Sequence, residues 1–294
     1  MIRNKRKTPL VSVIMPVYNG EPFLIDAVKS IISQTYENWE LICVDDRSTD
    51  GSWEQLVRFS REDKRIKPVK GRKKGYLSGS LNLALKRIRG KYIARMDADD
   101  VSLPQRIEKQ VEFLENNPDI LAVGGFLELI DEEGRVIGEK YFPTDSKECY
   151  KLIMNMMPIQ PPVLMARARV MKKLRYDTEV AKHDDIDIHF QLLRYGNFSN
   201  IDQVIFQYRK RPNSYTFSKV KDVFFMALRV RMRAIVKYGY RPTILSLFLA
   251  LAETVVILVL PSRSIVTLFE LVRLHSKNQS STQPRITPAL EKTE

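Results

Sequence analysis

The stretch from Lys91 to Asp100 constrains the fold more than any other part of the sequence, because an apolar segment runs directly into a cluster of acids. Tyr92 to Met96 is short and mostly apolar, which predicts a buried β-strand. Asp97, Asp99 and Asp100 follow it, and carboxylates this close repel one another unless a cation lies among them. A hard divalent cation such as Mg²⁺ or Mn²⁺ binds carboxylate oxygens together with substrate phosphates. The alternative is that these acids only cap the helix that follows.

Strands and helices alternate along the chain as far as residue 127. Apolar runs of strand length lie at residues 10–16, 41–44 and 120–127. Between them, apolar residues recur at helical spacing. This order predicts a mostly parallel, doubly wound α/β sheet flanked by helices. Ligands bind beyond the carboxyl ends of the strands in such sheets. The polar clusters at those ends are Tyr18–Asn19, Asp45–Asp46 and residues 97–100.

The pattern is less regular beyond residue 127. Residues 131–134 are expected to form a hairpin turn, and residues 161–167 a further short strand. A helix is expected to open at Asp184 and Asp185. One interpretation of these acids is that they are simple first-turn acids, which the helix dipole favours. Its buried face is expected to carry Ile186, Phe190 and Leu193. Asp185 and His189 are four residues apart and lie on a different face.

The C-terminal part has a different character. Residues 217–237 predict a basic amphipathic helix, and residues 244–260 are almost wholly apolar. A helix of that length is roughly 25 Å long, whereas the hydrocarbon core of a membrane is about 30 Å thick. A second amphipathic piece follows at 265–274, and the tail at 276–294 is expected to be disordered. The extension at 216–275 is expected to lie on an anionic membrane surface. The alternative is a helix buried in the domain or in an oligomer.

The composition limits the class of partner and the compartment. Forty-eight lysines and arginines against 35 acids give a net charge of +13, which favours an anionic partner. The basic segments carry few interleaved aromatic residues, which argues against nucleic acid. Two cysteines cannot form a disulfide framework and favour a reducing compartment. The N-terminal apolar run is too short for a secretory signal and is interpreted as a strand.

Four motifs taken together resemble the family 2 glycosyltransferases with the GT-A fold. They are Val11–Gly20, Asp45–Gly51, Ala94–Asp100 and Asp184–Asp187. The resemblance covers about residues 10 to 215. It implies an inverting enzyme, in which a sugar passes from a nucleotide-diphosphate sugar to a hydroxyl of a saccharide or lipid-linked acceptor. A UDP-sugar is the favoured donor and Mn²⁺ or Mg²⁺ the metal, and cell-surface polysaccharide synthesis is the expected role.

The resemblance also implies an organisation of the chain. A glycosyltransferase domain is expected at 8–215, with a nucleotide-sugar-binding part at 10–127 and an acceptor-binding part at 128–215. The helical extension at 216–275 would hold the enzyme peripherally or monotopically on the cytoplasmic face of the cell membrane.

Roles for individual residues follow from the same resemblance. Asp99 is expected to hold the metal, and Asp185 is expected to act as the general base toward the acceptor hydroxyl. The residues expected to contact the donor are Pro16, Val17, Tyr18, Asn19, Asp46, Asn82, Asp97, Ala98 and Arg211. Arg211 stands where many relatives have a histidine. An arginine can bind a diphosphate bidentately but cannot ligate a metal, so His183 is a second candidate for the histidine's place.

Two other functions compete with this interpretation. The first is a non-catalytic basic protein that binds an anionic membrane or nucleic acid, with the acids serving only as helix caps. The second is a nucleotidyltransferase, which would share the sheet and the metal-binding acids. Such an enzyme is expected to carry a glycine-rich phosphate loop after the first strand, and Tyr18, Asn19 and Gly20 do not form one.

Overall fold

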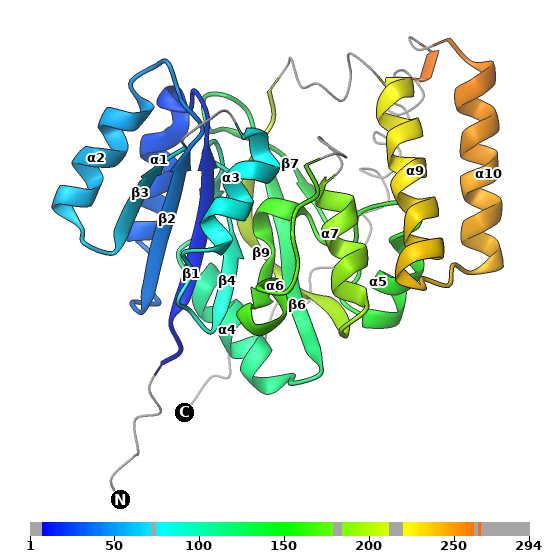
Figure 1. The fold of residues 1–294 in the computed structure, drawn as a ribbon, viewed down its shortest axis with the longest axis horizontal. Coiled ribbons are helices and arrows are strands. Elements are labelled where there is room, and N and C mark those ends of the chain that lie inside the picture. The colour runs from blue at the N-terminus through cyan, green and yellow to red at the C-terminus, as the bar shows by residue number, and fades with distance from the viewer. Residues whose placement is uncertain (1–7, 72–74, 179–183, 212–219, 262–263, 266–294) are drawn as a thin grey trace, which may run out of the picture.

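A nine-stranded sheet with helices on both faces forms the body of the protein (Figure 1). The computed structural model describes residues 8–71, 75–178, 184–211, 220–261 and 264–265. The strand order is β3-β2-β1-β4-β8-β6-β9-β5, and β7 pairs with β6. The strands are β1 (Val11–Val17), β2 (Trp39–Asp45), β3 (Ile66–Lys70), β4 (Tyr92–Arg95), β5 (Val101–Ser102), β6 (Ile120–Ile130), β7 (Val136–Lys140), β8 (Met165–Arg167) and β9 (Asn197–Arg209).

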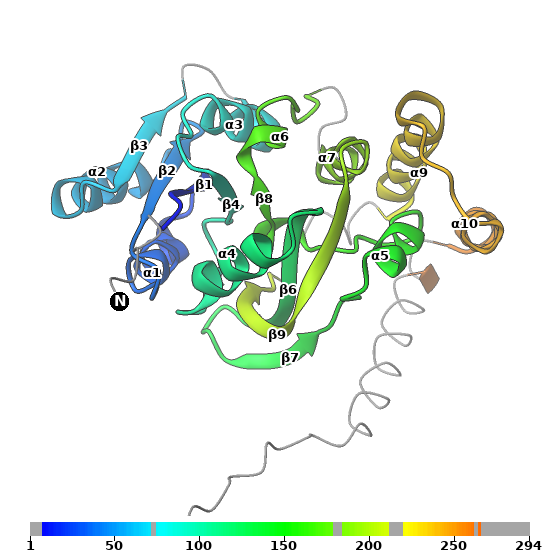
Figure 2. The ribbon, with the colours of Figure 1, turned by 90° about the horizontal axis from the view of Figure 1, so that it is seen from below.

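Helices cover both faces of the sheet, with α3 and α6 on one side and α1 and α4 on the other (Figure 2). The helices of the sheet domain are α1 (Glu21–Ile32), α2 (Ser52–Glu62), α3 (Tyr76–Leu85), α4 (Arg106–Asn116), α5 (Ser146–Leu152), α6 (Ala168–Met171) and α7 (Asp184–Leu193). Two further helices follow, α9 (Val220–Tyr238) and α10 (Ile244–Val259). The predicted α/β sheet flanked by helices is confirmed.

Strands β3, β2, β1 and β4 pair in parallel and form the first half of the sheet. Every residue of β2 and of β4 is buried, since helices cover both faces. This explains why these strands are continuous apolar runs in the sequence rather than alternating ones. Parallel pairing brings the carboxyl ends of these strands to one edge, where the predicted polar clusters lie.

The second half of the sheet is mixed. Strand β8 inserts between β4 and β6 and is antiparallel to both, while β6 and β9 are parallel to each other. The strand expected at 161–167 is therefore only partly correct. Residues Pro161–Val163 form a 3₁₀ turn, and β8 begins at Met165. Two consecutive prolines cannot donate ladder hydrogen bonds, so strand pairing is possible only after them. The hairpin turn expected at 131–134 does connect β6 to β7.

Helix α7 buries a different face from the one expected. Phe190 is buried as predicted, but Ile186 and Leu193 are partly exposed, and Asp187 and His189 are fully buried. Asp187 is buried because α9 packs along α7, whereas the ring of His189 lies against Phe198 of β9. Tyr238 of α9 donates a hydrogen bond of 3.0 Å to Oδ1 of Asp187, so this acid binds the two helices together.

Helices α9 and α10 form a hairpin at the end of the molecule farthest from β3 (Figures 1 and 2). Nη2 of Arg231 donates to the carbonyl oxygen of Asn155 at 2.7 Å, and Nδ2 of Asn155 donates to the carbonyl oxygen of Ser246 at 3.3 Å. Both helices are thus attached to the sheet domain, and the division expected at residue 215 stays a prediction. Among the described helices, none is both long and apolar enough to span a membrane. Most of the piece expected at 265–274, and the whole tail at 276–294, lie outside the described residues.

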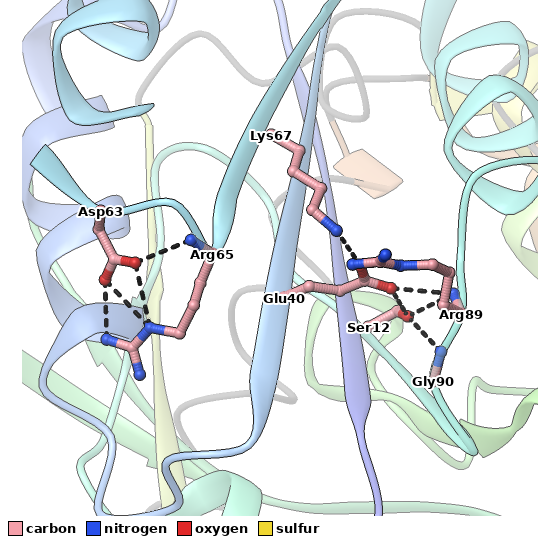
Figure 3. A network of polar contacts seen from close by, with 7 residues as sticks. All are labelled: Ser12, Glu40, Asp63, Arg65, Lys67, Arg89 and Gly90. Carbon is pink, nitrogen blue, oxygen red and sulfur yellow. Dashed lines mark hydrogen bonds and ion pairs between the residues drawn. The ribbon is translucent and has the colours of Figure 1, made fainter. Parts of the chain in front are cut away.

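A buried carboxylate joins the first three strands at the amino-terminal edge of the sheet. Glu40 of β2 accepts a hydrogen bond from Ser12 of β1 at 2.6 Å, and the ammonium group of Lys67 in β3 contacts its other oxygen. Arg89 donates through its backbone at 2.9 Å and its guanidinium at 3.1 Å. Figure 3 shows the carboxylate between Lys67 on one side and Ser12, Arg89 and Gly90 on the other. The network ties β1, β2, β3 and the turn before β4 together.

The pKa of Glu40 should make part of the stability dependent on pH. Burial of Glu40 would raise its pKa, but hydrogen bonds from Lys67, Ser12 and Arg89 outweigh it and lower the pKa from 4.5 to about 2. Because the folded pKa lies below the unfolded one, the stabilisation is complete above about pH 5 and is lost as the pH falls toward 2. A difference of this size corresponds to at most about 3 kcal/mol.

We expect Glu40→Gln to lower the free energy of unfolding at pH 7 by about 2–3 kcal/mol, because Lys67 and Arg89 lose their shared partner. Denaturant titrations of parent and variant at several pH values between 7 and 3 measure this. The difference between them should shrink as the pH falls. The control is Glu62→Gln, which removes an exposed pair with Arg58. A difference that stays constant down to pH 3 would contradict the assignment.

Candidate active site

The turns after β1 and β2 are held together at the carboxyl edge of the sheet. The backbone amide of Asn19 donates to Oγ of Ser48 at 3.0 Å, and that of Thr49 donates to Oδ1 of Asn19 at 2.9 Å. The side chain of Tyr18 is about half exposed at this edge, whereas Val17 is buried. The predicted donor-contacting residues from Pro16 to Asn19 therefore form a rigid wall, and the only large exposed side chain in it is an aromatic one.

Strained backbone gathers at the same edge. Within the described ranges, the non-glycine residues with positive φ are Asn19 at 49°, Arg47 at 65° and Tyr76 at 54°. Each follows a strand of the parallel half or opens the helix after it. Such conformations are unfavourable unless the surrounding structure holds them, and they concentrate at functional sites.

Asp46 and Asn82 are both engaged with backbone groups. Oδ1 of Asp46 accepts from the amide of Gly75 at 2.6 Å, so this buried carboxylate holds the start of α3. The side-chain amide of Asn82 accepts from the backbone amide of Tyr176 at 3.0 Å and donates to its carbonyl at 2.7 Å. Asn82 thus ties α3 to the segment before α7. A contact between Asn82 and a donor stays a prediction.

The acids after β4 occupy three different environments. Asp100 is buried, and its Oδ1 accepts from the amide of Arg209 at 2.9 Å, while its Oδ2 has no hydrogen-bond partner among the residues that the structure describes. Burial and the charges of Asp99 and Asp97 raise the pKa of Asp100 well above its usual range. Burial, with the charges of Asp99 and Asp185, also raises the pKa of Asp97, although Arg95 opposes this. Asp99 is the most accessible of the three, with its side chain 29% exposed. Asp100 is therefore the structural member of the cluster.

Buried arginines surround these acids. Arg106 is fully buried, and its Nη2 donates to the carbonyl oxygen of Arg95 at 2.6 Å. Burial lowers the pKa of Arg106 to about 9, although Asp100 and Asp97 oppose the shift. Arg209 donates through Nε to the carbonyl oxygen of Asp99 at 2.8 Å. Together these contacts fix the backbone on both sides of the acidic cluster.

The structure brings Asp99 and Arg211 together. Nε of Arg211 lies 3.0 Å from Oδ2 of Asp99, and its guanidinium carbon lies 5.0 Å from the centre of the Phe23 ring. The guanidinium of Arg209 lies over the same ring at 4.5 Å. Arg211 is the last residue before a segment that is not described, so Pro212, Asn213 and Ser214 lie outside the described residues. The same holds for His183.

Asp185 is brought to the acidic cluster from the other half of the chain. It is the second residue of α7, and one of its oxygens is contacted by Nη1 of Arg95. Nε and Nη2 of Arg95 also lie 3.3 Å from Oδ1 of Asp97. The side chains of Asp97 and Asp185 are 28% and 26% exposed, so both can reach a ligand. The predicted donor-side and acceptor-side acids are therefore neighbours around one guanidinium.

The acids fit a divalent cation that binds together with a diphosphate. Within the described part of the chain, no three His, Cys, Asp or Glu side chains form a preassembled metal site. Mg²⁺ and Mn²⁺ commonly bind through one or two carboxylates plus substrate phosphates, so a preassembled site is not required. Burial, and after it the charges of neighbouring acids, raises the pKa values of Asp97 and Asp100, and a bound cation would favour their charged forms. Asp97 and Asp99 are the partly exposed acids after β4, and Asp99 is the one paired with Arg211.

Several residues of the site could not be identified from the sequence motifs alone. They are Arg95, Arg106, Arg209 and Phe23. The one available signal was an arginine inside the otherwise apolar strand at 92–96, because a charge on a buried strand needs a partner. Asp97 lies two residues further along the chain, but Asp185 of α7 and Arg106 of α4 are brought close to Arg95 only by the fold.

Comparison with known proteins establishes the family. The family model for Glycosyl transferase family 2 matches residues 12–175. An uncharacterized glycosyltransferase of Haemophilus influenzae is 36% identical over 215 residues, which covers 70% of this chain and 67% of the relative. TuaG of Bacillus subtilis, provisionally named a teichuronic acid biosynthesis glycosyltransferase, is 41% identical over 106 residues, or 36% of this chain and 42% of that protein. The chain belongs to glycosyl transferase family 2 and is a glycosyltransferase.

Solved structures show the same fold. S. aureus TarS 1-349 in complex with UDP-GlcNAc has a TM-score of 0.60 at 20% identity, covering 77% of this chain and 66% of that one. The mannosyltransferase PcManGT of Pyrobaculum calidifontis, in complex with GDP-Man and Mn²⁺, has a TM-score of 0.57 at 17% identity, covering 95% and 89%. The predicted GT-A fold is thereby confirmed.

Proposed function

We propose that this glycosyltransferase moves a sugar, with inversion, from a nucleotide-diphosphate sugar to a hydroxyl of a saccharide or lipid-linked acceptor. The observation that carries the proposal is the meeting of Asp185 with Asp97 around Arg95 at the carboxyl edge of the sheet. A transferase needs a donor site and a base for the acceptor next to each other, and these acids come from the two halves of the chain. The partly exposed Asp185 is the candidate base.

The donor would lie along the edge formed by the turns after β1 and β2 and by the acidic cluster. The aromatic ring of Tyr18 and the acid Asp46 suit a nucleobase and ribose, and Arg211 suits a diphosphate. UDP-GlcNAc and GDP-Man are bound by the two solved relatives, and a UDP-sugar is our proposed donor. Asp99 would hold Mn²⁺ or Mg²⁺ together with the diphosphate, where the metal would neutralise charge on the leaving group.

The proposed chemistry on the acceptor side uses the carboxylate of Asp185. The acceptor hydroxyl attacks the anomeric carbon as the bond from that carbon to the diphosphate oxygen breaks. Asp185 takes the hydroxyl proton, and the nucleoside diphosphate leaves with the bonding electron pair. Attack from the face opposite the leaving group inverts the anomeric carbon.

The proposed biological role is the synthesis of a cell-surface polysaccharide. TuaG, which aligns with part of this chain, is named for teichuronic acid biosynthesis. The acceptor would bind in the part at 128–215, which contributes Asp185 through α7. Turnover of UDP-, GDP- and dTDP-sugars with Mn²⁺ tests the proposal, and release of no nucleoside diphosphate from any of them would reject it.

The outer face of α10 supports a proposed attachment to the membrane. Large apolar side chains cover it, and Ile244 is 89% exposed. The others on this helix are Leu245, Leu247, Phe248, Leu249, Leu251, Val255, Val256, Leu258 and Val259, and α9 adds Phe225, Met232 and Val236. Apolar patches of this extent on a monomer mark interaction surfaces. We refer to these residues as the outer apolar face.

The polar residues of α10 face inward. Ser246, Ala250 and Ile257 are buried, and Glu253 on the same side lies 4.0 Å from Nη1 of Arg231. The acid that would be unfavourable in lipid thus lies beside Arg231 of α9, with its side chain 44% exposed. At 16 residues, α10 is about 24 Å long, which is shorter than the roughly 30 Å hydrocarbon core. A helix lying flat in the interface of the cytoplasmic leaflet suits these facts, since exposed Arg229, Lys237 and Arg241 can reach anionic headgroups.

Asp99 and Arg211 should affect Mn²⁺ binding in opposite directions. Asp99→Asn is expected to abolish Mn²⁺-dependent binding of the donor and leave the fold intact.

Arg211→Ala is expected to raise the affinity for Mn²⁺ alone by about threefold or more, because the guanidinium competes for the Asp99 carboxylate. The same variant should weaken the binding of a nucleoside diphosphate more than the binding of the free nucleoside. Calorimetry measures the affinity for each of these ligands, and Arg58→Ala is the control. If Arg211→Ala weakened the binding of the nucleoside diphosphate and of the free nucleoside equally, a contact between Arg211 and the diphosphate would be excluded.

Asp185→Asn preserves size and removes basicity. We expect donor affinity to stay near that of the parent while transfer falls by roughly 10²-fold or more, which is typical for loss of a general base. Donor binding by calorimetry and transfer rates under saturating donor separate the two effects. Equal losses of binding and turnover would make Asp185 a structural residue.

The outer apolar face is tested with full-length protein and vesicles rich in phosphatidylglycerol. The parent is expected to pellet with them and to be only partly released by high salt, because apolar burial persists when charge is screened. Leu245→Glu combined with Phe248→Glu and Leu251→Glu should keep the protein in the supernatant. The control introduces glutamates at the exposed Val136 and Ile137 of β7. A parent that ignores vesicles and self-associates would show that a second copy covers this face.

A further inference from the structure

Arg95 is a buried cation with no route to the ligand. It ends β4, its side chain is 3% exposed, and β4 lies between β1 and β8 in the sheet. Its backbone is fixed on both sides, because its amide donates to the carbonyl oxygen of Leu164 at 2.8 Å and its carbonyl accepts from Arg106. A contact with the sugar or the diphosphate is excluded by this burial.

The guanidinium of Arg95 is divided between two acids from distant parts of the sequence. Nη1 contacts Asp185 of α7, while Nε and Nη2 lie 3.3 Å from Oδ1 of Asp97. Burial alone would lower the pKa of Arg95, but Asp185 and Asp97 raise it well above its usual range, so the charge persists. A buried charge of this kind is tolerated only when it is paired and hydrogen-bonded.

We propose that Arg95 is a positioning residue that holds the base Asp185 at a set distance and orientation from the donor-side acid Asp97. This inference rests on the proposed role of Asp185. In this proposal Arg95 aligns the two halves of the active site and contacts neither substrate.

The chemistry of arginine explains why this residue type stands here. A guanidinium is planar and directs five N–H groups in fixed directions, so it can bind two carboxylates at a defined mutual angle. Lysine has a single rotatable ammonium group and sets no such angle. Each acid keeps its outer side accessible, since the arginine approaches both from the buried side. Placement errors of about 1 Å can reduce catalysis by roughly 10²-fold.

The alignment also has a second layer of support. Nε of Arg106 donates to Oε1 of Gln110 at 3.2 Å, and Nε2 of Gln110 donates to the carbonyl oxygen of Val163 at 2.8 Å. Helix α4 and the turn before β8 thereby hold Arg106, which holds the backbone of Arg95. The chain of contacts therefore reaches from α4 through Arg106 and Arg95 to Asp185.

A double-mutant cycle tests the proposal in the full-length protein. Arg95→Lys keeps the charge and is expected to lower the transfer rate by roughly 10-fold or more. In the Asp185→Asn background, the same change should lower it by no more than about twofold, because a residue that acts through Asp185 has little left to align. If the two substitutions lowered the transfer rate independently, so that their fold-losses multiplied in the double variant, the proposal would be overturned.

Stability provides a readout that does not depend on activity. We expect unfolding equilibrium constants of the same four proteins to show a coupling of at least about threefold between Arg95→Lys and Asp185→Asn. Coupling in a protein that turns over no donor would reject the proposed function and leave the pairing intact. Additive stability effects would reject the pairing itself.

Arg167→Lys is the matched control. Arg167 is also an arginine at a strand end beside β4, but it lies at the opposite edge of the sheet and donates to the carbonyl oxygens of Leu114, Asn117 and Ile120. Its replacement is expected to change stability only, with no coupling to Asp185→Asn. Coupling of equal size at Arg167 would show that the cycle reports general loosening of the sheet.

Discussion

The site depends on burying several carboxylates at the ends of parallel strands without leaving their charges unpaired. Asp97, Asp99, Asp100 and Asp185 meet where the sheet opens, and isolated buried charges would be strongly unfavourable there. Arg95, Arg106 and Arg209 enter from the protein side and supply the compensating charge and hydrogen bonds. Burial and the neighbouring acids still raise the pKa values of Asp97 and Asp100, and a further cation at the site would favour their charged forms.

The arginines also explain how a site assembled from distant segments can be rigid. Arg209 joins the loop after β4 to the hairpin turn, because its Nη1 donates to the carbonyl oxygens of Asp131 and Glu132. Asp46 holds the start of α3 in the same way. These contacts order the loops before any ligand binds, so less ordering free energy is lost on binding.

The helical hairpin of α9 and α10 is bound to the same half of the molecule that carries the candidate base. Asp187 lies two residues from Asp185 on α7 and accepts a hydrogen bond from Tyr238 of α9. If α10 rests on a membrane as we propose, the base is attached to the membrane-facing side of the protein through this short path. A lipid-linked acceptor would then approach from the surface to which the enzyme is attached.

The sequence by itself determined β1, β2, β4 and β6 and the edge at which the acids meet, because apolar periodicity and strand order are local properties. It did not predict β3, β5 or β9. By resemblance it also predicted roles for Asp97, Asp99 and Asp185, and these roles stay predictions. Only the tertiary structure decided the rest. The burial of Asp187 depended on α9, and the burial of His189 depended on Phe198 of β9. One partner of Arg95, Asp97, lies two residues after it in the sequence, but the other, Asp185, lies on a distant helix, and such long-range pairing of charges has no signature in the local sequence.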